Sequence, residues 1–311
     1  MAHTLFRASA PGTLMLLGEH AVLQNKQALV VSIDKRITIL LKPRSDRQII
    51  IHSALGEFIT SLDTLQVKKP FQFVLATILR FRDQLKHGFE LKIDSEFTEN
   101  LGLGSSAAIT VATLAVMSQY TRNGEEVDKL KLFEGAKSII QEVQGVGSGA
   151  DVAASVYGGI IYYQQFPPYI LKQLSCLIPL VVIYSGSKTP TVDVIQQVEV
   201  ARSKRPQLFE QLYGSIGSCV REAIAAIEKK DWEELGSLMK IQQGLMNAIG
   251  VSTPLLNQLT DLLNETPGIF GSKISGSGLG DCVIGVGASN HSSIHPEEIS
   301  VRVSLQGVQH E

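Results

Sequence analysis

The stretch NLGLGSSAAITVATLAV, residues 100–116, places small residues directly before an apolar run that favours a helix. The first turn of a helix leaves backbone N–H groups without partners, and the aligned peptide dipoles place about half a positive charge there. A phosphate group satisfies both, because glycines let the backbone approach its oxygens and serine hydroxyls add ligands for phosphate or Mg²⁺. A tight turn with a serine N-cap explains the stretch equally well. The candidate phosphate-binding residues are Gly102, Leu103, Gly104, Ser105, Ser106 and Ala107.

This stretch matches neither of two common nucleotide-binding motifs. No Lys-Ser or Lys-Thr pair follows the glycines, as the Walker P-loop requires, and the GxGxxG pattern of dinucleotide-binding folds does not occur in it. If the stretch binds phosphate, it does so in another fold.

Two further glycine-rich turns carry candidate groups. The stretch VGSGADVAASVYGG, 146–159, ends its turn in Asp151, which could act as a general base for a substrate hydroxyl or as an anchor for a cation. Capping of a helix by Asp151 is the alternative. The stretch KISGSGLGDCVIG, 273–285, supplies Gly276, Ser277 and Gly278 as candidates, and a flexible loop between a helix and a strand is the alternative there.

The polar pair Glu19 and His20 interrupts the apolar stretch APGTLMLLGEHAV, residues 10–22. Burying such a pair is costly unless both side chains are hydrogen-bonded. The pair is therefore a candidate for substrate contact, and a hydrogen-bonded core histidine is the alternative for His20.

The composition excludes several classes of protein. A net charge of −2 gives no support for a general nucleic-acid binder, and the three cysteines form no CxxC pair that would indicate a zinc ribbon. No apolar run reaches the roughly 18–20 residues of a membrane helix, and no targeting segment is evident. These features predict a cytoplasmic protein with no nucleic-acid or membrane partner.

The elements around these turns predict an α+β fold, and the length favours two domains. Two β-branched runs, 28–33 and 36–41, are split by Asp34 and Lys35, which indicates two strands that are joined or bent there. The other expected strands are 47–53, 89–94, 158–165 and 176–186, with a last strand in the tail. The expected helices are 69–85, 106–122, 128–144, 191–202, 208–229, 231–250 and 253–265. The two prolines within 166–170 mark the expected domain boundary.

Taken together, the four motifs in this order resemble the GHMP kinase superfamily, over residues 8 to about 285. The resemblance implies an N-terminal α/β lobe over 1–168, which binds ATP, and a C-terminal ferredoxin-like lobe over 169–311. The active site is then expected between the two lobes.

Within this superfamily, GEHAVL and the stretch 242–259 are most similar to mevalonate kinases. Galactokinases have an Asp-Tyr pair where this chain has Ala21 and Val22. The third turn, SGSGLGDC, is closer to phosphomevalonate kinases, since Asp281 stands where mevalonate kinases usually have glycine. A phosphomevalonate kinase and a catalytically silent metabolite-binding protein therefore stay open as alternatives, with diphosphomevalonate decarboxylase as a third.

The resemblance implies transfer of the γ-phosphoryl group of ATP to the primary hydroxyl of mevalonate, a step of isoprenoid precursor synthesis. Three groups of residues then take roles. The first and third turns hold the phosphates, with Ser106 also a Mg²⁺ ligand. Asp151 accepts the proton of the substrate hydroxyl or orients it. Mevalonate contacts Glu19, His20 and Thr191. The sequence leaves open whether the chain is a monomer or a homodimer.

Two positions depart from the family pattern. Thr13 stands where the family usually has a lysine or arginine beside the catalytic aspartate, and a cation there would lower the pKa of that aspartate. Lys35, Arg36 and Lys188 are the candidate replacements. Glu142 is the nearest acid to the expected Mg²⁺-binding glutamate, with an offset shifted by about two residues.

Overall fold

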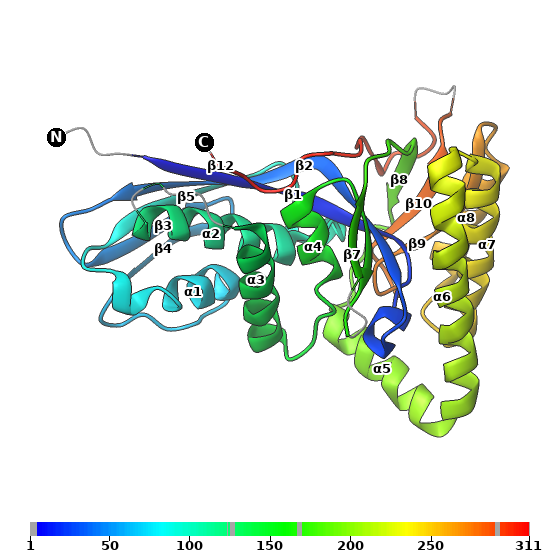
Figure 1. The fold of residues 1–311 in the computed structure, drawn as a ribbon, viewed down its shortest axis with the longest axis horizontal. Helices are drawn as coiled ribbons and strands as arrows, with labels where there is room; N and C mark the ends of the chain where they lie inside the picture. The colour runs from blue at the N-terminus through cyan, green and yellow to red at the C-terminus, as the bar shows by residue number, and fades with distance from the viewer. Residues whose placement is uncertain (1–4, 123, 125–127, 167–169, 290–292, 311) are drawn as a thin grey trace.

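The computed structural model describes residues 5–122, 124, 128–166, 170–289 and 293–310. Two lobes lie side by side along the long axis of the molecule, each with a sheet and its own helices (Figure 1). The expected α+β class is confirmed. Within the described ranges, no helix is long and apolar enough to cross a membrane.

The first lobe is built on a mostly antiparallel sheet of eight strands among the described residues. Their order is β12-β1-β2-β5-β3-β4, and β6 pairs with β2 and with β7. The strands are β1 (Phe6–Leu17), β2 (Ala28–Pro43), β3 (Gln48–Ser53), β4 (Gly56–Ser61), β5 (Phe89–Ser95), β6 (Ile160–Gln164), β7 (Ile170–Leu174) and β12 (Gln309–His310).

The long strand β2 changes partner along its length. Ala28–Val31 pairs with β6, whereas Ile37–Pro43 pairs with β5, and the exposed Asp34 lies between the two halves. The predicted strand pair, joined or bent at Asp34 and Lys35, is thus a single bent strand. Strand β1 runs from the first lobe toward the second, and β2 returns antiparallel to it, so the end of β1 reaches the region between the lobes (Figure 1).

Four helices pack under this sheet: α1 (Gln72–Leu79), α2 (Ser105–Thr121), α3 (Lys129–Gln144) and α4 (Ala150–Tyr157). Helix α2 is buried on nearly all sides, as its run of small and apolar residues predicts. It packs against β1, α1 and α3 in the main core of the lobe. The N-termini of α2 and α4 each follow a glycine-rich turn, so both of these turns lead directly into a helix.

The second lobe has a four-stranded sheet in the order β11-β8-β10-β9. Its strands are β8 (Leu180–Tyr184), β9 (Ile269–Ser275), β10 (Cys282–Gly287) and β11 (Glu298–Ile299). Its helices are α5 (Thr191–Lys204), α6 (Pro206–Lys229), α7 (Trp232–Ile249) and α8 (Pro254–Glu265). Helix α7 approaches β9 closely through Gly236, where a Cβ atom would lie 2.5 Å from the backbone of Phe270. This contact fixes β9, which leads into the third glycine-rich turn.

The predicted domain boundary at residues 168 and 169 lies outside the described residues. Strand β7, which follows it, pairs with β6 in the first sheet, and β12 at the end of the chain pairs with β1. The first sheet therefore contains strands from both sides of the predicted boundary.

Candidate active site

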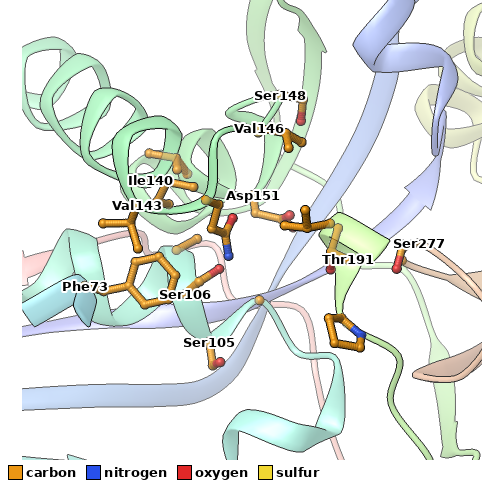
Figure 2. A pocket seen from close by; sticks show the side chains of 18 of the residues that line it. Phe73, Ser105, Ser106, Ile140, Val143, Val146, Ser148, Asp151, Thr191 and Ser277 are labelled. Carbon is orange, nitrogen blue, oxygen red and sulfur yellow. The ribbon is translucent and has the colours of Figure 1, made fainter. Parts of the chain in front are cut away.

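The structure brings the four sequence motifs together around one cavity of about 1260 Å³ between the lobes. Figure 2 shows Asp151 near its middle, with Ser105 and Ser106 on one side and Thr191 and Ser277 on another. Asp151 and all the candidate phosphate-, substrate- and metal-binding residues line the cavity except two. Leu103 is buried and its carbonyl accepts a hydrogen bond from the N–H of Thr13 at 3.0 Å. Gly278 packs on Val251 instead.

The first turn presents an open helix start to this cavity. Helix α2 begins at Ser105 with Gly104 as its N-cap, and no side chain caps it, so the serine-cap alternative does not apply. Gly104 has a φ of +64°, and a Cβ atom there would lie 1.9 Å from Oγ1 of Thr13. The glycine is required by both its conformation and this contact. The free N–H groups and the two serine hydroxyls suit phosphate oxygens.

Asp151 lies in the first turn of α4, which Gly149 caps. Its Oδ1 accepts a hydrogen bond of 2.8 Å from Oγ1 of Thr13, so the carboxylate is used across the cavity wall and does not cap its own helix. Burial raises the pKa of Asp151, while the bond from Thr13 and the charge of Lys188 lower it. The group is a carboxylate with enhanced basicity, as a general base needs.

Glu19 and His20 line the cavity, but their polar atoms already have protein partners. The carboxylate of Glu19 forms a buried ion pair with Lys273 and accepts a hydrogen bond from Gln242. Nε2 of His20 lies 2.8 Å from the carbonyl oxygen of Ser277, and because burial lowers the pKa of this imidazole, a neutral ring donates that bond. The alternative for His20, a hydrogen-bonded core histidine, therefore describes this geometry. That Glu19 or His20 contacts the substrate stays a prediction.

Lys273 and Gln242 are functional neighbours that sequence reasoning missed. Lys273 lies on β9 with no exposed surface, and Gln242 on α7 is also fully buried. A lysine within an otherwise small and apolar strand was the available signal, because a buried ammonium needs a carboxylate partner. The sequence did not identify Glu19 as that partner.

The third turn contains three polar atoms that are buried and have no hydrogen-bond partner among the described residues. They are Oγ of Ser275, Oγ of Ser277 and Oδ1 of Asp281, and all three residues line the cavity. Buried polar groups in native proteins are nearly always bonded. These atoms are therefore available to a polar ligand in the cavity.

Asp281 lies directly against the first turn. A Cβ atom on Gly102 would lie 2.8 Å from its Oδ1. Burial is the main cause that raises the pKa of Asp281 to about 6, with a smaller contribution from the charge of Asp151 and an opposing one from Lys188. Two carboxyl groups and one lysine thus share this side of the cavity.

The remaining predicted residues lie at different places. Thr191 is the exposed first residue of α5 and lines the cavity. Glu142 also lines it, but its carboxylate pairs with Arg80 at 2.5 Å, which lowers its pKa. Of the three replacement cations, only Lys188 lines the cavity. Arg36 instead donates to Ser9 and to the carbonyl of Gly307.

One end of the cavity is apolar and was not predicted. Figure 2 shows Phe73, Ile140 and Val143 gathered there, from α1 and α3, and Ala76 and Val146 extend this wall. Their sequence pattern does not distinguish them from core residues, because apolar side chains at helical spacing can face either the core or a cavity. A flat, apolar ring would fit this end.

The site also fits a magnesium ion that is held mainly by phosphates. In the part of the chain that the structure describes, no three His, Cys, Asp or Glu residues could hold a metal by themselves. Mg²⁺ in phosphoryl-transfer sites typically keeps several waters and uses one or two protein ligands besides the phosphates. The hydroxyl of Ser106 is available as such a ligand at the cavity wall, and the carboxylate of Glu142, which also lines the cavity, would have to share its charge with Arg80.

Comparisons with known proteins show the family to which this chain is similar. The family model for the GHMP kinases N terminal domain matches residues 72–159, and that for the GHMP kinases C terminal matches residues 223–300. The mevalonate kinase of Archaeoglobus fulgidus is 32% identical, over 95% of this chain and 99% of that protein. That of Thermococcus gammatolerans is 30% identical, over 96% and 93%. The crystal structure of the Methanococcus jannaschii mevalonate kinase has a TM-score of 0.78 and 25% identity, over 92% and 91% of the two chains.

Proposed function

The chain belongs to the GHMP kinase family, and from that premise we propose that it is a mevalonate kinase. It transfers the γ-phosphoryl group of ATP to the primary hydroxyl of mevalonate. The observation that carries this proposal is the position of Asp151, a half-buried carboxylate in the cavity that the open N-terminus of α2 also faces. The helix N-terminus is suited to the phosphates of a phosphoryl donor, and the carboxylate is suited to the hydroxyl of an acceptor.

The nucleotide takes the half of the cavity formed by the first lobe. The N–H groups and hydroxyls of Ser105 and Ser106 bind the β- and γ-phosphates, and the adenine ring lies on the apolar wall around Phe73 and Val143. Ser106 and Glu142 would hold the Mg²⁺, which neutralises phosphate charge when it is bound. Ser275 and Ser277 donate to the phosphates from the opposite side, which gives both unpartnered hydroxyls of the third turn a partner.

The acceptor hydroxyl lies at Asp151. As the hydroxyl oxygen forms its bond to the γ-phosphorus, the bond from that phosphorus to the bridging oxygen of ADP breaks, and the hydroxyl proton passes to Asp151. Thr13 holds the carboxylate in place through its 2.8 Å hydrogen bond. Such a reaction depends mainly on positioning and on charge neutralisation.

The distribution of cations supports mevalonate as the acceptor. Among the described residues, four basic residues line the cavity: Lys68, Lys69, Arg80 and Lys188. The first three belong to the segment that also provides Phe73 at the apolar end. Only Lys188 comes from the second lobe, which provides Thr191 and Ser277. A phosphorylated acceptor would need more positive charge there.

A coupled ADP-release assay with mevalonate, phosphomevalonate, homoserine and galactose tests this proposal. We expect turnover with mevalonate at a kcat/KM at least tenfold above that with the other three. Turnover mainly with phosphomevalonate would instead make the chain a phosphomevalonate kinase, the alternative that its third turn resembles. A folded protein that binds ATP and turns over none of the four would instead be a silent metabolite-binding protein.

A further inference from the structure

The acceptor side of the cavity carries more negative than positive charge. Asp151 and Asp281 both line it, and position 13 provides a neutral threonine. The incoming phosphates add further negative charge. A phosphoryl-transfer site has to neutralise the charge that spreads over the transferred group, and a group with a fixed positive charge does this most effectively.

Lys188 is the one cavity-lining cation of the described chain that acts on both carboxylates. Its charge lowers the pKa of Asp151 and that of Asp281. By contrast, Arg80 is paired with Glu142 on the first lobe. Lys68 and Lys69 lie on the segment before α1, and neither affects the pKa of Asp151 or Asp281.

The backbone around Lys188 is fixed to the third turn. The N–H of Asp281 donates to the carbonyl of Ser187 and the N–H of Ser185 donates to the carbonyl of Asp281, both at 2.9 Å. Gly280 lets the two segments touch, because a Cβ atom there would lie 3.1 Å from Cα of Lys188. The lysine is therefore held in register with Asp281.

The side chain of Lys188 then reaches across to the first turn. Its Nζ donates to the carbonyl oxygen of Glu99 at 2.7 Å, three residues before Gly102. An ammonium group has three donors, and this is the one hydrogen bond from it that the described residues show. The other two donors are available for a phosphate or for the acceptor.

We propose that Lys188 supplies the positive charge that this site lacks at position 13. Its ammonium group stabilises the ionised Asp151 and the oxygens of the phosphoryl group in transfer, and its hydrogen bond to the carbonyl of Glu99 keeps it over the first turn. This inference rests on the proposed kinase function. Lys188 is exposed in the open cavity, and its charge becomes more effective when nucleotide and acceptor displace the water around it.

Substitutions that separate charge from hydrogen bonding test the proposal. Lys188→Met removes both, whereas Lys188→Gln removes the charge and keeps a donor for the carbonyl of Glu99. We expect both variants to lose about 10²-fold in kcat, the size of effect seen when one transition-state donor is removed, with each KM changed by less than about threefold. Lys35→Met is the matched control, because Lys35 does not line the cavity, and it should keep the wild-type kcat.

A chemical rescue gives a second, independent readout. Lys188→Cys treated with bromoethylamine regains an ammonium group at nearly the original distance, and its kcat should rise at least tenfold over the untreated variant. Wild-type protein treated in the same way controls for modification of Cys176, the native cysteine that is not buried. A Lys188→Gln variant with the wild-type kcat, or a Lys188→Cys variant that the treatment does not rescue, would overturn the proposal.

The comparison uses whichever acceptor of the four the wild-type protein phosphorylates best. If the wild-type protein prefers another acceptor, the mevalonate kinase assignment is wrong. The ratio of the kcat of Lys188→Gln to the kcat of the wild type, measured with that acceptor, still decides the role of Lys188. For a wild type that turns over none of them, the same ratio is taken from its slow hydrolysis of ATP to ADP and phosphate. Equal hydrolysis rates in the two proteins would overturn the proposal there.

Discussion

Oγ1 of Thr13 donates a 2.8 Å hydrogen bond to Oδ1 of Asp151 across 138 residues of sequence. Thr13 belongs to β1 and Asp151 to the start of α4, so this bond connects the strand of the first motif to the helix of the second. The same threonine packs against Gly104 of the phosphate-binding turn. One side chain therefore fixes the candidate base relative to the candidate phosphate site.

The first prediction concerns Asp151 itself. Asp151→Asn keeps the size of the side chain and its hydrogen bond to Thr13 but cannot accept a proton. We expect kcat with mevalonate to fall by about 10²–10⁴-fold, the usual contribution of a general base, while the Kd for ATP changes by less than about threefold. Steady-state kinetics and calorimetric titration with ATP check the two parts. A variant that keeps most of its rate would show that Asp151 is not the base.

The second prediction uses the bond from Thr13. Burial raises the pKa of Asp151, and this hydrogen bond lowers it, because it stabilises the charged form. Thr13→Val removes the bond, so the pKa of Asp151 rises further. Since the base works only when ionised, activity is lost as the pH falls through this pKa. The acidic limb of the profile of kcat/KM against pH should therefore move to higher pH.

Thr13→Ser is the matched control for this pH experiment, because it keeps the hydroxyl. Its acidic limb should coincide with that of the wild type to within about 0.3 pH units, well inside the shift that loss of a whole hydrogen bond produces. If the acidic limb of Thr13→Val also coincided with that of the wild type, the hydrogen bond from Thr13 would not affect the pKa of Asp151.

The site's outline could be predicted from the sequence because its motifs are local. A glycine-rich turn before a helix has its chemistry written into neighbouring residues, and Ser105, Ser106 and Asp151 all line the cavity as predicted. The bend of β2 at Asp34 was also visible, since a charged pair interrupts two apolar runs. Each turn alone left an alternative without a ligand open, and it was the order of the four motifs, which resembles a known family, that favoured the site.

The rest depends on contacts between distant segments. Nothing near Lys273 in the sequence indicates that its partner is Glu19, 254 residues away. Strand β7 has no signal that would place it in the first sheet rather than the second. Among three candidate cations, the sequence could not single out Lys188, because its position beside Asp281 follows from backbone pairing between two loops.

The third prediction concerns the close contact at Gly104. Gly104→Ala places a methyl group 1.9 Å from Oγ1 of Thr13 in a conformation with a φ of +64°. Thr13 has to move, which displaces both the start of α2 and the carboxylate of Asp151. We expect the KM for ATP to rise at least tenfold and kcat to fall by a similar factor. Steady-state kinetics with each substrate varied in turn measures both.

Gly250→Ala is the control that separates this contact from backbone strain. Gly250 also has a positive φ, +85°, but a Cβ atom there meets nothing within 4 Å, and the residue lies at the end of α7 away from the cavity. The left-handed conformation alone should cost about 1–2 kcal/mol of stability and leave both kinetic constants unchanged. Equal kinetic effects of the two substitutions would rule out the packing explanation for Gly104.

The last prediction concerns the buried ion pair between Glu19 and Lys273. Removing one partner leaves an uncompensated charge in the interior, so Lys273→Met should lower the free energy of unfolding by about 3–5 kcal/mol. Replacing both, as Glu19→Gln with Lys273→Met, should recover part of that loss. Urea unfolding followed by the fluorescence of Trp232, the single tryptophan of the chain, measures this for the second lobe.

The exposed pair of Arg47 and Asp63 provides the comparison for this ion pair. Its atoms lie 2.7 Å apart, yet both side chains are at least half exposed, so Arg47→Met should cost no more than about 1 kcal/mol. The difference between the two losses reports what burial adds. If Lys273→Met cost as little as Arg47→Met, the lysine would be neutral in the folded protein, and Glu19 would hold its position through Gln242 rather than through charge.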